Sequence, residues 1–316
     1  MENALLARIV KGVGGLYTVT VLSEDSELCS ESIRCRARGA FRHNHISPLP
    51  GDLVYIRPDA QRQNAEEISY VIDEITDRRN ALIRPPMANL DYLFVTMAAA
   101  SPSPILSTVD KLISIAEHNK IEPVIVITKC ELDSDYAEEL YSLYSRAGFT
   151  CFKLSAKEDI GVAPIDEFIK ANLPHKTAAF AGASGIGKST LLNRLFPSLE
   201  LTTSEISRKI ERGRHTTREV VLFPLSDSSD CGYIADTPGF SMLDFKRFDF
   251  FEKDELINTM RDFQGYIGEC RYTKCSHTKE DGCAIIEAVK KGDIARSRHD
   301  SYVELYDVLK TKKKWD

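Results

Sequence analysis

No stretch of this sequence approaches the roughly 18 consecutive apolar residues that a membrane-spanning helix needs. The first residues, MENALLARIV, lack the basic start and long apolar segment of a signal peptide. Internal repeats are absent, and the short basic end KTKKKWD is the one biased segment. Lys and Arg number 41 against 47 Asp and Glu, giving a net charge of -6, which excludes a uniformly basic nucleic-acid binder. We therefore expect a cytoplasmic protein without a membrane partner, whose contacts with nucleic acid come from local basic patches.

The eight cysteines do not indicate a disulfide framework. Five of them stand singly in apolar or strand-like stretches, where a reducing cytosol keeps them as inert thiols: Cys29, Cys35, Cys130, Cys151 and Cys231. The other three lie close together near the C-terminus and are considered below.

The 316 residues are enough for two or three domains, and the residue pattern changes twice along the chain. Residues 1–75 contain short β-like runs broken by turn residues, which predicts a small all-β domain. In residues 76–245 apolar strands alternate with helical stretches, which predicts an α/β domain with a parallel sheet covered by helices. Residues 246–316 predict a helical domain around the cysteine cluster.

A phosphate-binding loop is the strongest local signal. The segment 182–190 reads GASGIGKST, follows the apolar run AAFA and opens a helical run, which is the strand, glycine loop and helix order that such a loop requires. Its backbone amides and helix N-terminus suit phosphate groups. Lys188 is expected to reach the β- and γ-phosphates, and the Ser189 hydroxyl to bind magnesium. The nucleotide-binding residues predicted here are Gly182, Ala183, Ser184, Gly185, Ile186, Gly187, Lys188, Ser189 and Thr190.

Two downstream segments complete the phosphate end of the site. Asp236 ends an apolar strand and begins the sequence DTPG, so it can hold magnesium through water while the Gly239 amide senses the γ-phosphate. Between the two motifs, the polar segment 210–218 can supply a threonine hydroxyl to the magnesium, which makes it a candidate switch. Spacing leaves Thr216 and Thr217 open, and we favour Thr217.

Two upstream segments are candidates for base recognition. The strand PVIVI leads into Thr128, Lys129, Cys130 and Glu131, where the Lys stem can lie along a base plane and the Glu131 carboxylate can accept from the two N–H donors on guanine's edge. A further strand leads into Leu154 followed by Ser155 and Ala156, which matches a second base-contacting loop. Strand C-termini are where ligands bind in such sheets.

The order of these motifs is circularly permuted, because the base-recognition segments precede the phosphate loop and DTPG follows it. The switch segment then leads almost directly into the C-terminal domain. We therefore formulate the hypothesis that nucleotide hydrolysis is coupled to the position of that domain.

With these motifs in this order, the chain resembles the RsgA (YjeQ) family of circularly permuted GTPases of the small ribosomal subunit, over essentially its whole length. The resemblance implies an N-terminal OB-fold β-barrel, a permuted P-loop GTPase domain with Mg²⁺ and GTP, and a C-terminal zinc-binding domain. It also implies GTP hydrolysis stimulated by the small subunit, with that subunit and its rRNA as partners of a chain that we expect to be monomeric.

Two residues depart from the expected pattern. Phe240 follows the DTPG glycine where many GTPases carry a water-orienting Gln, so His215 becomes the candidate for positioning the attacking water, beside Lys188 and Thr217 as catalytic residues. An RNA-phosphate or structural contact is the alternative for His215. Glu131 stands where the family has Asp, and its longer side chain predicts a looser grip on guanine.

The cysteine cluster predicts a structural metal site. Cys270, Cys275, His277 and Cys283 offer three thiolates and one imidazole within fourteen residues, which suits one tetrahedral zinc ion with no open position.

Two basic patches are candidates for RNA contact. Arg34, Arg36 and Arg38 alternate, so they share one face of a strand, and Arg42 follows. The lysines of the C-terminal tail form the second patch. A solvated charged face is the alternative for both. For the whole chain the alternatives are a P-loop kinase, which the base-recognition segments disfavour, and an RNA-binding scaffold that binds GTP without hydrolysing it.

Overall fold

The computed structural model describes residues 4–39, 41, 46–59, 70–197, 220–226, 228, 230–236 and 251–311. The chain forms two compact units. The first comprises Met1–Tyr92, Phe168–Phe180 and Ser198–Gly239, and the second comprises Leu93–Glu167, Ala181–Pro197 and Phe240–Asp316. Among the described residues, no helix combines the length and the apolar character that a bilayer span requires.

A closed five-stranded barrel forms the N-terminal part of the first unit, which confirms the expected OB-type fold. Its strands are β1 (Leu5–Val13), β2 (Leu16–Val21), β3 (Ser32–Ala37), β4 (Leu53–Pro58) and β5 (Tyr70–Ile75). They pair in the order β1-β2-β3-β5-β4, and β4 returns to β1 to close the barrel. Gly14 and Gly15 both have positive φ, which suits the tight β1–β2 turn. Alternate residues such as Val19 and Val21 fill the barrel interior.

Three further strands belong to the first unit, apart from Ala181 at the end of one of them. They are β11 (Thr177–Ala181), β12 (Val221–Pro224) and β13 (Tyr233–Asp236). β13 runs parallel to β11 and antiparallel to β12, and β12 pairs with β1 of the barrel at Val221 and Lys11. A small hairpin of β6 (Ala81–Leu82) and β7 (Met87–Ala88) follows the barrel in sequence.

Arg8 joins the barrel to these strands. Its guanidinium, 4% exposed, donates to the Thr177 hydroxyl at 2.8 Å and to the His175 carbonyl at 3.1 Å. The ring of Tyr233 lies 5.0 Å from the guanidinium carbon. Burial removes water from the Arg8 cation and so lowers its pKa. The hydrogen bonds and the ring contact compensate in part for that lost water.

The second unit contains the parallel strands and helices that the alternating pattern predicted. Strands β8 (Tyr92–Ala98), β9 (Glu122–Thr128) and β10 (Thr150–Lys153) lie side by side, and β9 and β10 are parallel. The helices are α2 (Leu106–His118), α3 (Ser134–Arg146), α4 (Val162–Asn172, which continues into the first unit) and α5 (Lys188–Leu195). β8 and β9 are almost wholly buried, which explains their continuous apolar runs.

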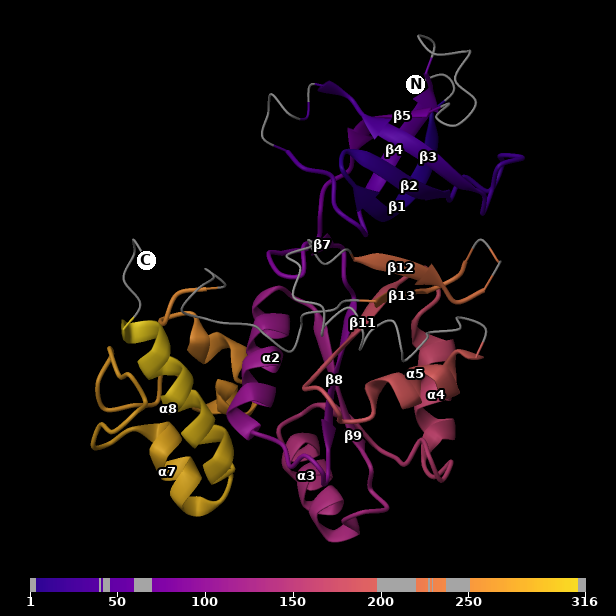
Figure 1. The fold of residues 1–316 in the computed structure, drawn as a ribbon. Coiled ribbons are helices and arrows are strands. Elements are labelled where there is room, and N and C mark those ends of the chain that lie inside the picture. Colours follow the sequence, from indigo (N-terminus) through magenta and orange to yellow (C-terminus); the bar gives the residue numbers. More distant parts are fainter. Residues whose placement is uncertain are drawn as a thin grey trace. The chain divides into compact units, whose positions relative to one another are not determined.

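The C-terminal part of the second unit is helical, as expected. Its described residues, 251–311, form the 3-10 turns η3 (Leu256–Thr259) and η4 (Arg261–Tyr266) and the helices α7 (Ala284–Lys291) and α8 (Arg296–Thr311). α7 ends at Gly292, whose φ of 83° provides the left-handed cap. α8 lies alongside α2 (Figure 1).

Candidate functional site

The glycine loop has the backbone geometry of a phosphate cradle. Gly182, Gly185 and Gly187 have φ values of 147°, 78° and 95°, a region that side chains disfavour. A Cβ on Gly182 would lie 2.2 Å from the Thr96 carbonyl oxygen. Gly187 caps α5, so the loop delivers its amides directly to a helix N-terminus.

Lys188 is the first residue of α5 and folds back over this loop. Its ammonium donates to the carbonyls of Gly182 and Ala183 at 2.7 and 2.6 Å. Burial lowers the pKa of Lys188 to about 8, because the loss of water disfavours the charged ammonium. The site thus contains a cation that an anionic ligand would stabilise.

The segment after β9 contacts the glycine loop. The buried Thr128 hydroxyl donates to the Ile186 carbonyl at 2.5 Å, and the Lys129 ammonium donates to the Gly185 carbonyl at 2.7 Å. Lys129 also donates to the carbonyl of Ser101, in the loop after β8. This role of Ser101 has no signal in the sequence, because the contact joins loops 28 residues apart.

The segment after β10 is closed into a compact loop. Ser155 and Ile160 exchange backbone hydrogen bonds at 2.8 and 3.0 Å, and the buried Ser155 hydroxyl accepts from the Glu158 amide at 3.1 Å. The Cys130 amide donates to the Leu154 carbonyl at 3.3 Å, so both candidate base-recognition segments are hydrogen-bonded to each other. The Glu131 side chain is exposed.

The remaining nucleotide-site candidates are placed only in part. Asp236 is the last residue of β13, and its backbone pairs opposite Val221. The other candidates at the phosphate end, Gly239, Thr217 and His215, lie outside the described residues, as do Thr216, Phe240 and the basic tail from residue 312.

The four predicted metal ligands come together. Their ligand atoms all lie within 4.8 Å of one another. The Cys270 and Cys283 sulfurs are 3.9 Å apart, and they lie 3.4 and 3.5 Å from His277 Nδ1. Tetrahedral zinc places two sulfurs about 3.8 Å apart and sulfur and nitrogen about 3.6 Å apart. The donor set therefore fits a closed tetrahedral metal site.

The surrounding backbone holds these ligands in position. The Ala284 amide donates to the Cys270 sulfur at 3.3 Å. Glu280 accepts from the amides of Ser276 and Thr278 at 2.9 and 3.1 Å, which fixes the turn that carries His277. Such outer contacts are typical of structural metal sites.

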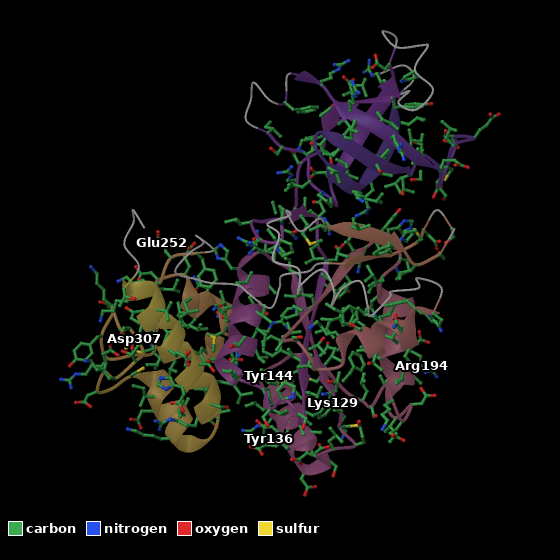
Figure 2. All side chains as sticks on the ribbon, in the orientation of Figure 1. Lys129, Tyr136, Tyr144, Arg194, Glu252 and Asp307 are labelled. Atoms are coloured by element: carbon green, nitrogen blue, oxygen red, sulfur yellow. The ribbon has the colours of Figure 1, made fainter. Side chains whose placement is uncertain are left out.

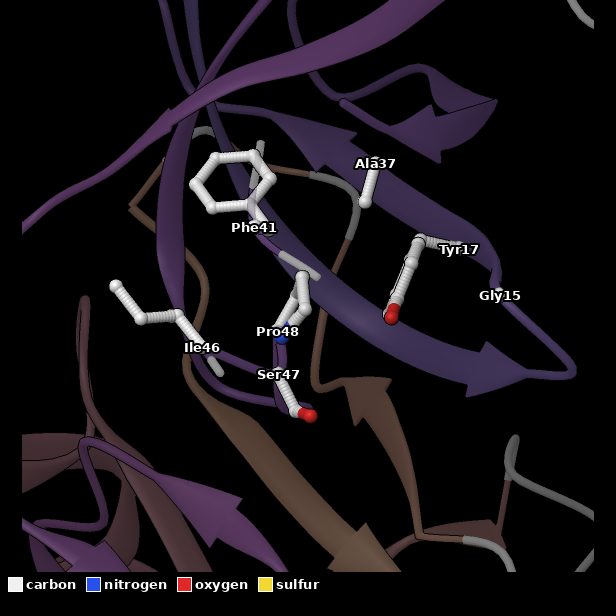
Figure 3. A pocket seen from close by; sticks show the side chains of 7 residues that line it. All are labelled: Gly15, Tyr17, Ala37, Phe41, Ile46, Ser47 and Pro48. Atoms are coloured by element: carbon white, nitrogen blue, oxygen red, sulfur yellow. The ribbon is translucent and has the colours of Figure 1, made fainter. Parts of the chain in front are cut away.

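The arginines of β3 differ in their surroundings. Cys35 is fully buried, so Arg34 and Arg36 on either side of it point away from the barrel interior. Arg38 forms an ion pair with Asp73, and Arg42 lies outside the described residues. A hollow of about 440 Å³ lies at the end of β3, with Ala37 and the rings of Tyr17 and Phe41 in its lining (Figure 3).

Comparison with known proteins decides the family. The model of the RsgA GTPase domain matches residues 75–246, and that of the RsgA N-terminal domain matches residues 7–65. The chain belongs to the RsgA GTPase family. Its relatives include proteins named small ribosomal subunit biogenesis GTPase RsgA. That of Bacillus subtilis is 39% identical over 97% of this chain and 98% of its own length, and that of Ruminiclostridium cellulolyticum is 38% identical over 96% and 94%.

Solved structures extend this relationship to the fold. YjeQ from Thermotoga maritima superimposes with a TM-score of 0.80 at 30% identity, covering 98% of this chain and all of that one. YloQ, described as a circularly permuted GTPase, superimposes with a TM-score of 0.75 at 34% identity over 99% and 97% of the two chains. The permuted GTPase fold expected from the motif order is thereby confirmed.

Proposed function

We propose that this protein is a GTPase that binds the small ribosomal subunit, hydrolyses GTP to GDP and phosphate when bound there, and assists the late maturation of that subunit. The glycine loop with the half-buried Lys188 ammonium folded over it is the observation that carries the GTPase part of the proposal. The names of the relatives, which span almost the whole chain, support the ribosomal part.

Phosphate binding falls to the loop and helix at residues 182–190. The amides of the glycine loop and the Lys188 ammonium neutralise the β- and γ-phosphates, and Lys188 exchanges its carbonyl partners for phosphate oxygens. Ser189, Thr217 and Asp236 would hold Mg²⁺, which supplies positive charge at the phosphate oxygens when bound. A hydroxyl such as that of Ser189 in the first turn of α5 is a hard oxygen ligand that suits this ion.

His215 is our candidate for orienting the attacking water, since an apolar Phe240 cannot do so. Thr217 contributes by closing the switch segment on the triphosphate. Guanine is read by Glu131 at its N–H edge and by the Ala156 amide at O6, while the Lys129 stem lies along the base. Thr128 donates its hydroxyl to the Ile186 carbonyl and so supports the backbone of the glycine loop.

The Cys270, Cys275, His277 and Cys283 cluster holds one structural Zn²⁺ in this proposal, because three thiolates and one imidazole favour zinc over harder cations. Ribosomal RNA is contacted through the outer face of β3, with Arg34 and Arg36 as its cations and with Arg38 and Arg42 beside them. We further propose a monomer that acts in the cytoplasm.

The test is multiple-turnover GTP hydrolysis with and without isolated small ribosomal subunits. We expect turnover to rise with subunits, and His215→Ala to lose at least about a hundredfold of that stimulated rate while still binding GTP. His175→Asn is the matched control, because His175 is exposed and Asn tolerates its positive φ. GTP binding without turnover would instead identify a scaffold, and full stimulated turnover of His215→Ala would refute its catalytic role.

A further inference from the structure

The loops that surround the candidate nucleotide site are joined in a closed ring of hydrogen bonds. Lys129 connects the segment after β9 to the glycine loop, and the Cys130 amide connects the same segment to Leu154 at the end of β10. The glycine loop continues into α5. One link remains to close the ring, between α5 and the loop 155–160.

Arg194 and Asp159 provide that link. Arg194 lies in the last turn of α5 (Figure 2), and its Nε and Nη2 donate to the two carboxylate oxygens of Asp159 at 3.0 and 2.7 Å. This is the bidentate arrangement in which a guanidinium fixes both the position and the orientation of a carboxylate. Through Asp159, Arg194 therefore fixes the position of loop 155–160 relative to the phosphate-binding helix α5.

The backbone of loop 155–160 needs such support. Asp159 has a φ of 57° and Gly161 a φ of 68°, and a Cβ on Gly161 would lie 2.4 Å from the Lys153 carbonyl oxygen. Left-handed backbone at a non-glycine residue persists where the surroundings hold it. Asp159 combines this conformation with the carboxylate that Arg194 binds, so the ion pair acts next to Ile160, where the backbone closes the loop.

A second ion pair near β10 provides a comparison. Lys153, at the end of β10, forms an ion pair with Glu138 of α3. The side chains of this pair are 44% and 55% exposed, close to the 49% and 58% of Arg194 and Asp159. The Lys153 pair joins the strand to a helix that carries no candidate nucleotide contact. The Arg194 pair joins the base-recognition loop to the helix that begins at Lys188.

We propose that Arg194 is a positioning residue for guanine recognition, which holds loop 155–160 through Asp159 so that the Ala156 amide stays aimed at guanine O6. This inference rests on the proposed GTPase function. Guanine and hypoxanthine both present an O6 acceptor, whereas adenine presents an amino group at that place. The effect of Arg194 should therefore follow O6 and not the phosphates.

The experiment measures the dissociation constants of GDP, IDP and ADP for the full-length protein and its variants at low salt. Arg194→Met keeps the stem without the charge, and Asp159→Asn keeps a residue that tolerates positive φ. We expect each to weaken GDP and IDP by about threefold to fivefold, as suits an exposed pair with good geometry, and to leave ADP unchanged. The double variant should resemble the single ones, Arg194→Lys should recover part of the loss, and the differences should shrink at 1 M salt.

Lys153→Met is the matched control and should bind GDP as the wild type does. The turnover number at saturating GTP and the nucleotide-free melting temperature should not change in the Arg194 variant, which separates positioning from a loss of folding. If Arg194→Met lowers the melting temperature, the binding constants of Asp159→Asn alone test the proposal. Equal weakening of GDP and ADP, additive losses, or a control as weak as Arg194→Met would overturn the proposal. A wild type without preference for GDP over ADP would instead count against the proposed function.

Discussion

Arg298 of α8 forms an ion pair with Asp110 of α2 in which both side chains are 1% exposed. The same guanidinium donates to Asp262 at 3.0 Å, and Tyr144 of α3 donates its hydroxyl to Asp110 at 3.1 Å. Burial acts to lower the pKa of Arg298, but the two carboxylates outweigh it and raise that pKa, so the arginine remains charged. The C-terminal helices are thus attached to α2 and α3 by a buried charge cluster.

Removing that arginine should destabilise the second unit strongly. Arg298→Leu leaves Asp110 and Asp262 buried without their cation, and breaking a buried pair in this way costs about 3–5 kcal/mol. Urea unfolding followed by circular dichroism would measure the loss. Arg296→Leu is the control, because the pair of Arg296 with Asp300 is exposed and its loss should change stability by under about 1 kcal/mol. Equal effects of the two substitutions would show that the buried cluster contributes no special stability.

Nucleotide binding should take up protons above neutral pH. The pKa of Lys188 is about 8 in the free protein because of burial, and phosphate groups next to the ammonium would raise it again. The free protein then loses a proton from Lys188 as pH rises through 8, while the complex keeps it. GDP affinity should fall by roughly tenfold between pH 7.5 and 9. Calorimetric titration in buffers of different ionisation enthalpy would measure the proton uptake directly.

Lys188→Arg provides the control for this pH effect. A guanidinium does not deprotonate in this range, so the variant should bind GDP with an affinity that stays constant between pH 7.5 and 9, whatever its absolute value. The same pH dependence in wild type and Lys188→Arg would assign the titration to another group.

The sequence could predict the elements and the local motifs, because their signals lie within a few residues of one another. The buried strands β8 and β9 are continuous apolar runs, and the four metal ligands lie within a stretch of fourteen residues. The links between elements could not be predicted in this way. Arg194 and Asp159 are 35 residues apart, and Arg298 and Asp110 are 188 apart, so tertiary contacts alone bring these pairs together.

Loss of the metal should unfold the C-terminal part without abolishing nucleotide binding. Cys275→Ser removes one of the four ligands of the proposed zinc site in a short, loop-rich segment, and such segments depend on their metal for folding. We expect the zinc content to fall from one ion per chain, amide protection to disappear in α7, and GDP affinity to change by less than about twofold. Metal analysis and hydrogen exchange are the measurements. Cys29→Ser should alter none of them, and retention of full zinc by Cys275→Ser would exclude it as a ligand.

The pairing of β12 with the barrel predicts which residues respond to a change of the bound nucleotide. β12 follows the candidate switch segment directly, β13 ends at Asp236, and β1 of the barrel pairs with β12 at Lys11 and Val221. A movement of the switch segment would therefore strain backbone hydrogen bonds that the barrel shares, whereas Arg298 keeps α8 on a helix that carries no candidate switch residue. Hydrogen exchange should differ between GDP and a non-hydrolysable GTP analogue at β12 and at Lys11, and remain equal in α8. The motif order alone led to a different hypothesis, in which the C-terminal domain responds to hydrolysis. A change of exchange confined to α8 would support that hypothesis and rule out transmission through β12.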